Sequence, residues 1–199
     1  CPMGIDVAAV MDALRTLAVR IFSTIIGMAA GIVLARLLGP EGKGVFTMVT
    51  LITGVYVILV SNVSGAISHG IGRRKFDPGK VMTNALVILA VFAVISWAGA
   101  AFIYLYLWRT EWWFLFFSAA GAPFTVIVPY VSSSLLGQDK VKEVNQVTAT
   151  SVIINSILPV GFLLIADREV TLALWGWLIG QFAAGSWVYL RMRKWYKPV

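Results

Sequence analysis

The chain has 199 residues, of which 59% are hydrophobic and 13% are charged, and its formal net charge at pH 7 is +7. Soluble domains average about 25% charged residues, so the composition excludes an ordinary soluble domain and indicates a helical membrane protein. The positive charge does not indicate a nucleic-acid partner, because the basic residues cluster in short connections and at the C-terminus, as expected for cytoplasmic loops.

Six apolar segments of roughly 20 residues follow one another, and each is long enough to cross the hydrocarbon core of a bilayer. The predicted spans cover residues 19–38, 45–67, 81–106, 114–136, 144–166 and 170–190. They follow an amphipathic lead-in at residues 1–18, which either lies on the membrane surface or extends the first span. We therefore expect an all-α integral membrane protein in which residues 1–199 form a single domain of six transmembrane helices.

The strongest turn signal links the first two spans and has the sequence Ala35-Arg36-Leu37-Leu38-Gly39-Pro40-Glu41-Gly42-Lys43-Gly44. Proline lacks a backbone donor and glycine leaves the backbone free, so this cluster predicts an interruption of the helix. The chain is expected to cross the bilayer, reverse tightly here and cross back.

An even number of spans places both termini on the same side of the membrane, and the basic residues indicate which side. With the N-terminus in the cytoplasm, the cytoplasmic side holds Arg15, Arg20, Arg73, Arg74, Lys75, Lys80, Lys140, Lys142, Arg191, Arg193, Lys194 and Lys197. The opposite side holds only Arg36, Lys43, Arg109 and Arg168. This threefold bias predicts that both termini are cytoplasmic.

Two small-xxx-small patterns predict close helix packing, because glycines let the backbones of membrane helices approach each other. The first pattern pairs Gly27 with Gly31 in the first span, and the second pairs Gly176 with Gly180 in the sixth. For the first pair, glycines placed by chance in an apolar helix are the alternative interpretation.

The inventory of reactive side chains argues against an enzyme and against a resident cofactor or metal. The only histidine, His69, lies in a basic loop, and the only cysteine is Cys1, so neither has the partners that a metal site needs. No carboxylate lies deep inside a predicted span, where a carrier coupled to protons or sodium usually holds one. Any ion coupling is therefore expected to come from another region or subunit.

The candidates for substrate binding are neutral polar residues within the spans and arginines at the cytoplasmic surface. The neutral set consists of Asn62, Asn145, Gln146, Asn155 and Gln181. Amides offer the neutral hydrogen bonds that sugars use, and hydrogen bonds between helices are an equally weighted alternative. Arg20, Arg73 and Arg74 are candidates to bind a diphosphate headgroup, with simple membrane anchoring as the alternative.

The sequence from position 35 to position 46 resembles the first-hairpin signature of the polysaccharide transporter family. These are the Wzx-type flippases of the multidrug/oligosaccharidyl-lipid/polysaccharide exporter superfamily. The residues that match the signature are Arg36, Gly39, Pro40, Glu41 and Gly44. Residues 135–145, with Asn155 and Pro159 beyond them, resemble the family's cytoplasmic step between spans 4 and 5.

The resemblance implies a MATE-like transporter with two six-helix lobes around a central cavity, of which this chain supplies the N-terminal lobe. Such proteins flip undecaprenyl-diphosphate-linked oligosaccharides across the bacterial cytoplasmic membrane by alternating access, for surface polysaccharide biosynthesis. The implied partners are that lipid-linked oligosaccharide, membrane lipids and a second six-helix lobe from the same full-length chain or another subunit. The alternatives are a non-transporting scaffold that binds a polysaccharide synthase, and a lobe of a drug/cation antiporter.

Overall fold

The computed structural model describes residues 7–106, 112–165 and 169–195, and the elements within these ranges are all α-helices. They are α1 (Val7–Gly72), α2 (Pro78–Tyr106), α3 (Trp112–Leu136), α4 (Val141–Ile165) and α5 (Val170–Trp195). Short turns separate α1 from α2 and α3 from α4, at the two basic or polar connections that the sequence indicates. The lead-in is helical from Val7 and continues directly into the first predicted span.

Helix α1 contains a kink at Gly39 that divides it into a first arm, residues 7–38, and a second arm, residues 40–72. Gly39 has φ 69° and ψ 180°, a conformation essentially restricted to glycine. Pro40 begins the second arm, a position where its missing N–H would have no helical acceptor. The predicted reversal is present, but the predicted turn over residues 39–44 is too long, because the helix resumes at once after Gly39.

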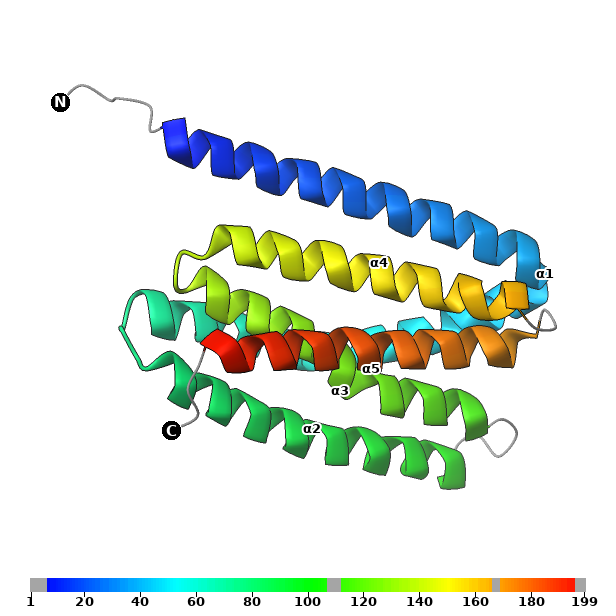
Figure 1. The fold of residues 1–199 in the computed structure, drawn as a ribbon. Helices are drawn as coiled ribbons and strands as arrows, with labels where there is room; N and C mark the ends of the chain where they lie inside the picture. Colours follow the sequence, from blue (N-terminus) through cyan, green and yellow to red (C-terminus); the bar gives the residue numbers. More distant parts are fainter. Residues whose placement is uncertain (1–6, 107–111, 166–168, 196–199) are drawn as a thin grey trace.

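Six helical segments, the two arms of α1 followed by α2 to α5, alternate in direction along the bundle (Figure 1). The start of α1, the α1–α2 turn, the α3–α4 turn and the end of α5 therefore lie at the same end. We call it the basic end, because it carries Arg15, Arg73, Arg74, Lys75, Lys80, Lys140, Lys142 and Arg191. The Gly39 kink lies at the opposite end, next to Arg36 and Lys43.

Among the described residues, four helical stretches are long and apolar enough to cross a membrane: Val10–Ile58, Pro78–Tyr106, Trp113–Leu136 and Val141–Ile165. The first stretch runs through the kink and includes parts of both arms. Helix α5 is less apolar, because Gln181 and several tryptophans interrupt its aliphatic residues. The chain is thus a multi-pass helical membrane protein, whereas the count of six spans and the cytoplasmic location of the termini stay predictions.

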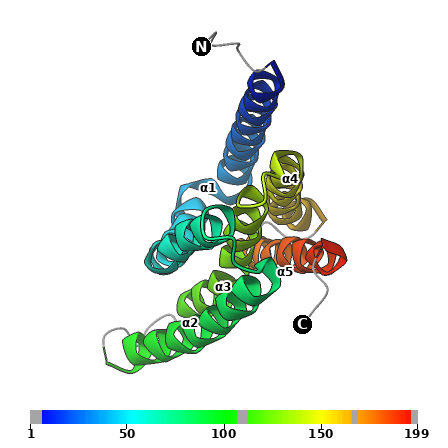
Figure 2. The same ribbon diagram turned by 90° about the vertical axis from the view of Figure 1, so that its left-hand side faces the viewer.

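Helix α3 occupies the centre of the bundle, as the view from the basic end in Figure 2 shows. Its small residues Ser118, Ala119 and Ala122 are fully buried, which lets the surrounding helices approach its backbone closely. The Ser118 hydroxyl also donates a hydrogen bond to the backbone oxygen of Val49 at 3.2 Å and so links α3 to the second arm. The core is therefore built around one helix whose small side chains allow close packing on several sides.

The two glycine patterns differ in their contacts. A Cβ atom at Gly176 would stand 2.8 Å from a backbone oxygen of α4, and one at Gly180 would stand 3.0 Å from Oδ1 of Asn155. This pattern packs tightly against α4, as predicted. Apart from the adjoining residues and backbone of its own helix, no part of the described chain lies within 4 Å of a Cβ placed at Gly27 or Gly31, so the first arm does not make the predicted contact within this part of the protein.

Candidate functional site

Four polar side chains of α4 lie on one side of the helix, and we call them the α4 polar row: Asn145, Thr148, Ser151 and Asn155. At its first residue the row meets the first arm of α1, where Nδ2 of Asn145 donates a hydrogen bond to Oγ1 of Thr16 at 3.1 Å. Thr16 is not among the predicted site residues, because no local pattern links a hydroxyl in the lead-in to an amide 129 positions away. The pair ties the first arm to α4 near the basic end.

Further from the basic end, the row contains buried oxygen atoms that have no hydrogen-bond partner within the described chain. These atoms are Oγ of Ser151 and Oδ1 of Asn155. On the first arm of α1, Oγ of Ser23 is likewise buried without a hydrogen-bond partner in the described chain. An unpartnered buried polar atom costs on the order of 1–3 kcal/mol, so it calls for a water molecule or a ligand group. Gly180 of α5 leaves the space that the Asn155 amide occupies.

The other predicted amides do not extend the row. Gln146 is exposed at the basic end, where its Oε1 accepts a hydrogen bond from Nη2 of Arg191 at 3.4 Å. Asn62 is exposed on the second arm of α1, and Gln181 is buried on α5. The structure therefore brings Asn145 and Asn155 onto one helix side, places Gln181 on the adjoining helix, and leaves Gln146 and Asn62 on the surface.

The three predicted arginines do not form one cluster. Arg20 is exposed on the first arm, about one turn beyond Thr16, whereas Arg73 and Arg74 are exposed in the turn between α1 and α2. Figure 2 shows the first arm and α2 on opposite sides of the bundle, with α3 between them. Arg20 therefore belongs to the side of the α4 polar row, and the Arg73–Arg74 pair belongs to another face.

The signature residues shape the hairpin at the end opposite the basic end. Gly39 provides the kink and Pro40 begins the second arm. Glu41 is exposed in the first turn of that arm, where a negative charge interacts favourably with the helix dipole. Arg36 is exposed, and a Cβ at Gly44 would meet no atom within 4 Å. The backbone conformation of Gly39 and the proline that follows it explain the chain reversal.

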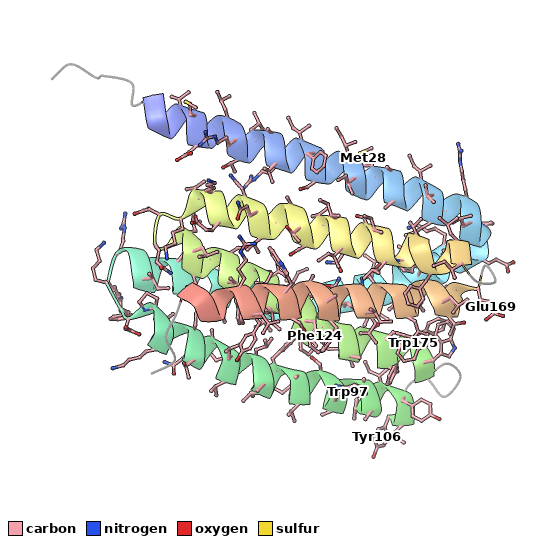
Figure 3. The ribbon with its side chains drawn as sticks, in the orientation of Figure 1. Met28, Trp97, Tyr106, Phe124, Glu169 and Trp175 are labelled. Atoms are coloured by element: carbon pink, nitrogen blue, oxygen red, sulfur yellow. The ribbon has the colours of Figure 1, made fainter. Side chains whose placement is uncertain are left out.

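Within the described residues, no group of three histidine, cysteine or carboxylate side chains could hold a metal ion. The acidic residues of this part of the chain lie near helix ends: Asp12, Glu41, Asp77, Asp139, Glu143 and Glu169. Figure 3 shows one of them, Glu169, at the start of α5, on the side of the molecule away from the basic end. The polar groups of the α4 polar row are, in contrast, neutral hydroxyls and amides.

A solved structure with a similar fold shows the outward-facing conformation of a multidrug resistance MATE family transporter of the MOP superfamily. The TM-score is 0.65 and the sequence identity is 20%, over 96% of this chain and 48% of that chain. The fold resembles one half of a MATE transporter. No protein-family model matches the sequence, and no curated protein matches it.

This similarity confirms the predicted MATE-like lobe as a fold, and the chain spans about half the length of the MATE transporter that it resembles. Because an identity of 20% concerns the fold alone, the superfamily, the transporter role and the Wzx-type flippase stay predictions.

Proposed function

We propose that this chain is one lobe of a transporter that flips an undecaprenyl-diphosphate-linked oligosaccharide across the bacterial cytoplasmic membrane for surface polysaccharide biosynthesis. A second six-helix lobe, from the same full-length chain or from another subunit, completes the cavity. The likeness to half of a MATE transporter supports this architecture, because alternating access needs two lobes that rock against each other around a shared site.

The α4 polar row is the observation that carries the choice of cargo. Its oxygens at Ser151 and Asn155 are buried and unpartnered in this conformation, and they become acceptors for sugar hydroxyls when the neighbouring helices separate during alternating access. A cationic cargo would instead favour a buried carboxylate, and the described carboxylates lie near helix ends. The neutral chemistry of the row therefore supports a glycan.

Arg20 provides the positive charge that a diphosphate headgroup requires. It is exposed on the first arm, about one turn beyond the hydrogen bond between Thr16 and Asn145, and so lies on the same side of the bundle as the polar row. A guanidinium group binds phosphate oxygens through two parallel hydrogen bonds. In this arrangement the headgroup contacts Arg20 and the oligosaccharide extends along α4.

A lobe of a drug/cation antiporter is the second candidate, because the solved structure of similar fold is a multidrug resistance transporter. A scaffold for a polysaccharide synthase is the third, because the first arm exposes large apolar side chains. Met28, for example, is 64% exposed and points away from the bundle (Figure 3). These candidates predict different cargo or different partners and can be separated directly.

The test is translocation of a fluorescent lipid-linked oligosaccharide by the purified full-length protein in vesicles. Flipping without a synthase is the expected result. Ion-driven uptake of a cationic drug without flipping would identify an antiporter, and flipping only when a synthase is added would identify a scaffold.

A matched pair of variants tests the role of Arg20 in the same assay. Arg20→Gln should lower the flipping rate about tenfold, the effect of losing one charge-assisted contact. Arg15→Gln is the control, because Arg15 lies on the same arm and pairs at 3.5 Å with the carboxylate of Asp12 instead. Equal rates for the two variants would remove Arg20 from the site.

A further inference from the structure

A groove of about 410 Å³ lies between the end of α1 and the start of α2, at the basic end. Its polar lining includes His69, Arg74 and Asn84, and its apolar lining includes Val63, Ala85 and Ile88. The histidine and the arginine are close to the helix ends, whereas Val63 lies nearly two turns before His69 and Ile88 lies almost three turns into α2. The groove therefore changes from cationic to apolar along the direction of the membrane normal.

Backbone hydrogen bonds in the α1–α2 turn fix the position of Arg74. The backbone oxygen of His69 accepts from the N–H of Arg73 at 3.0 Å and from the N–H of Arg74 at 3.4 Å. The N–H of Phe76 donates to the backbone oxygen of Gly70 at 3.1 Å, and the Phe76 ring lies 3.3 Å from the place of a Gly70 Cβ. The ring thus covers Gly70 and forms part of the groove lining.

The start of α2 is fixed by a cap. Oδ1 of Asp77 accepts a hydrogen bond from the N–H of Lys80 at 2.9 Å, which holds this carboxylate at the helix N-terminus. The remaining charges of the turn, at Arg73, Arg74 and Lys75, are positive. The mouth of the groove is therefore a preformed, electropositive surface next to an apolar wall.

We propose that this groove binds an anionic phospholipid of the membrane, with the headgroup phosphate at Arg74 and an acyl chain along Ala85 and Ile88. The Arg74 guanidinium can hold two phosphate oxygens, and His69 and Asn84 offer further donors in the same groove. Basic clusters at the membrane surface attract anionic lipids. A lipid fits better than a soluble anion, because the apolar wall continues from the phosphate site toward the bilayer core.

This lipid site is independent of the proposed transport site. The α1–α2 turn and α2 lie on the opposite side of the bundle from the first arm (Figure 2), and the groove shares no lining residue with the α4 polar row. A bound phospholipid would contact both α1 and α2 and so stabilise their packing. The inference holds whatever cargo the protein carries.

The charge test compares Arg74→Gln with Arg73→Gln, because the two changes are chemically identical and only Arg74 lines the groove. Binding of phosphatidylglycerol to the full-length protein is measured by native mass spectrometry, with phosphatidylcholine as the uncharged reference lipid. Arg74→Gln should weaken phosphatidylglycerol binding about tenfold, and Arg73→Gln should weaken it less than about twofold. Equal losses would show diffuse surface attraction and overturn the proposal.

A second pair of variants changes the shape of the groove at constant charge. Ile88→Trp places a larger side chain in the groove, and Val87→Trp places the same side chain on the neighbouring exposed surface of α2. Only Ile88→Trp should reduce phosphatidylglycerol binding, again about tenfold. Unchanged phosphatidylglycerol binding in Ile88→Trp would show that no acyl chain lies along Ile88 and would overturn the proposed site.

Discussion

Gly121 of α3 contacts the indole ring of Trp177 of α5 so closely that a Cβ atom at position 121 would stand 2.6 Å from Cζ3 and closer still to Cη2. Trp177 is only 6% exposed, so its ring has little room to move away. The missing side chain at position 121 is therefore what lets α5 pack against the central helix.

We predict that Gly121→Ala destabilises the protein by about 1–3 kcal/mol through overpacking, despite the higher helix propensity of alanine. Thermal unfolding in detergent measures the effect. Gly161→Ala is the control, because a Cβ at this position of α4 would meet nothing within 4 Å, and it should leave stability unchanged or raise it. Equal stability of the two variants would mean that the ring of Trp177 adjusts freely.

Gly39→Ala should destabilise the hairpin by about 1–3 kcal/mol, because an L-residue is strained at φ 69° and ψ 180°. The amount of folded protein after mild heating, followed by size-exclusion chromatography, reports the loss. Gly44→Ala lies in the same signature and has open space for its new methyl group, so it should behave like the unmodified protein. If the Gly39→Ala protein were as stable as the Gly44→Ala protein, the positive φ angle at position 39 would be contradicted.

The hydrogen bond between Thr16 and Asn145 should give a coupling energy of about 0.5–1.5 kcal/mol in a double-mutant cycle with Thr16→Val and Asn145→Leu. Thr24→Val replaces Thr16→Val in the control cycle. The Thr24 hydroxyl donates to the backbone oxygen of Arg20 on its own helix, so the control cycle should be additive. Coupling of the same size in both cycles would reject a specific contact between the first arm and α4.

Asn155→Leu should separate stability from transport. Leucine has a similar shape and removes an unpartnered buried oxygen, so the unfolding temperature should stay the same or rise. Flipping of the lipid-linked oligosaccharide should fall, because the α4 polar row loses a group that can bind a sugar hydroxyl. Ile157→Leu on the exposed side of α4 is the control and should change neither quantity. Full flipping activity in Asn155→Leu would remove Asn155 from the cargo site.

Local properties of the chain account for what the sequence predicted correctly. A continuous apolar segment of about 20 residues satisfies its own backbone hydrogen bonds in a membrane by forming a helix, and this holds whatever the neighbours are. Likewise, glycine and proline act on the backbone where they stand, so the reversal at Gly39 was predictable. The length of the turn was not predictable in the same way. Whether the helix resumes directly after Gly39 depends on cooperative backbone hydrogen bonds, which the propensities of single residues do not describe.

The pairing of helix faces was decided only by the tertiary structure. The helices are apolar nearly all round, so sequence periodicity does not show which side of each one meets a neighbour. Gly180 packs against α4 while Gly31 does not pack within the described chain, although both stand in the same small-xxx-small pattern. In the same way, Arg20 and Arg74 look alike in the sequence, yet the bundle places their segments on opposite sides, because α3 lies between them.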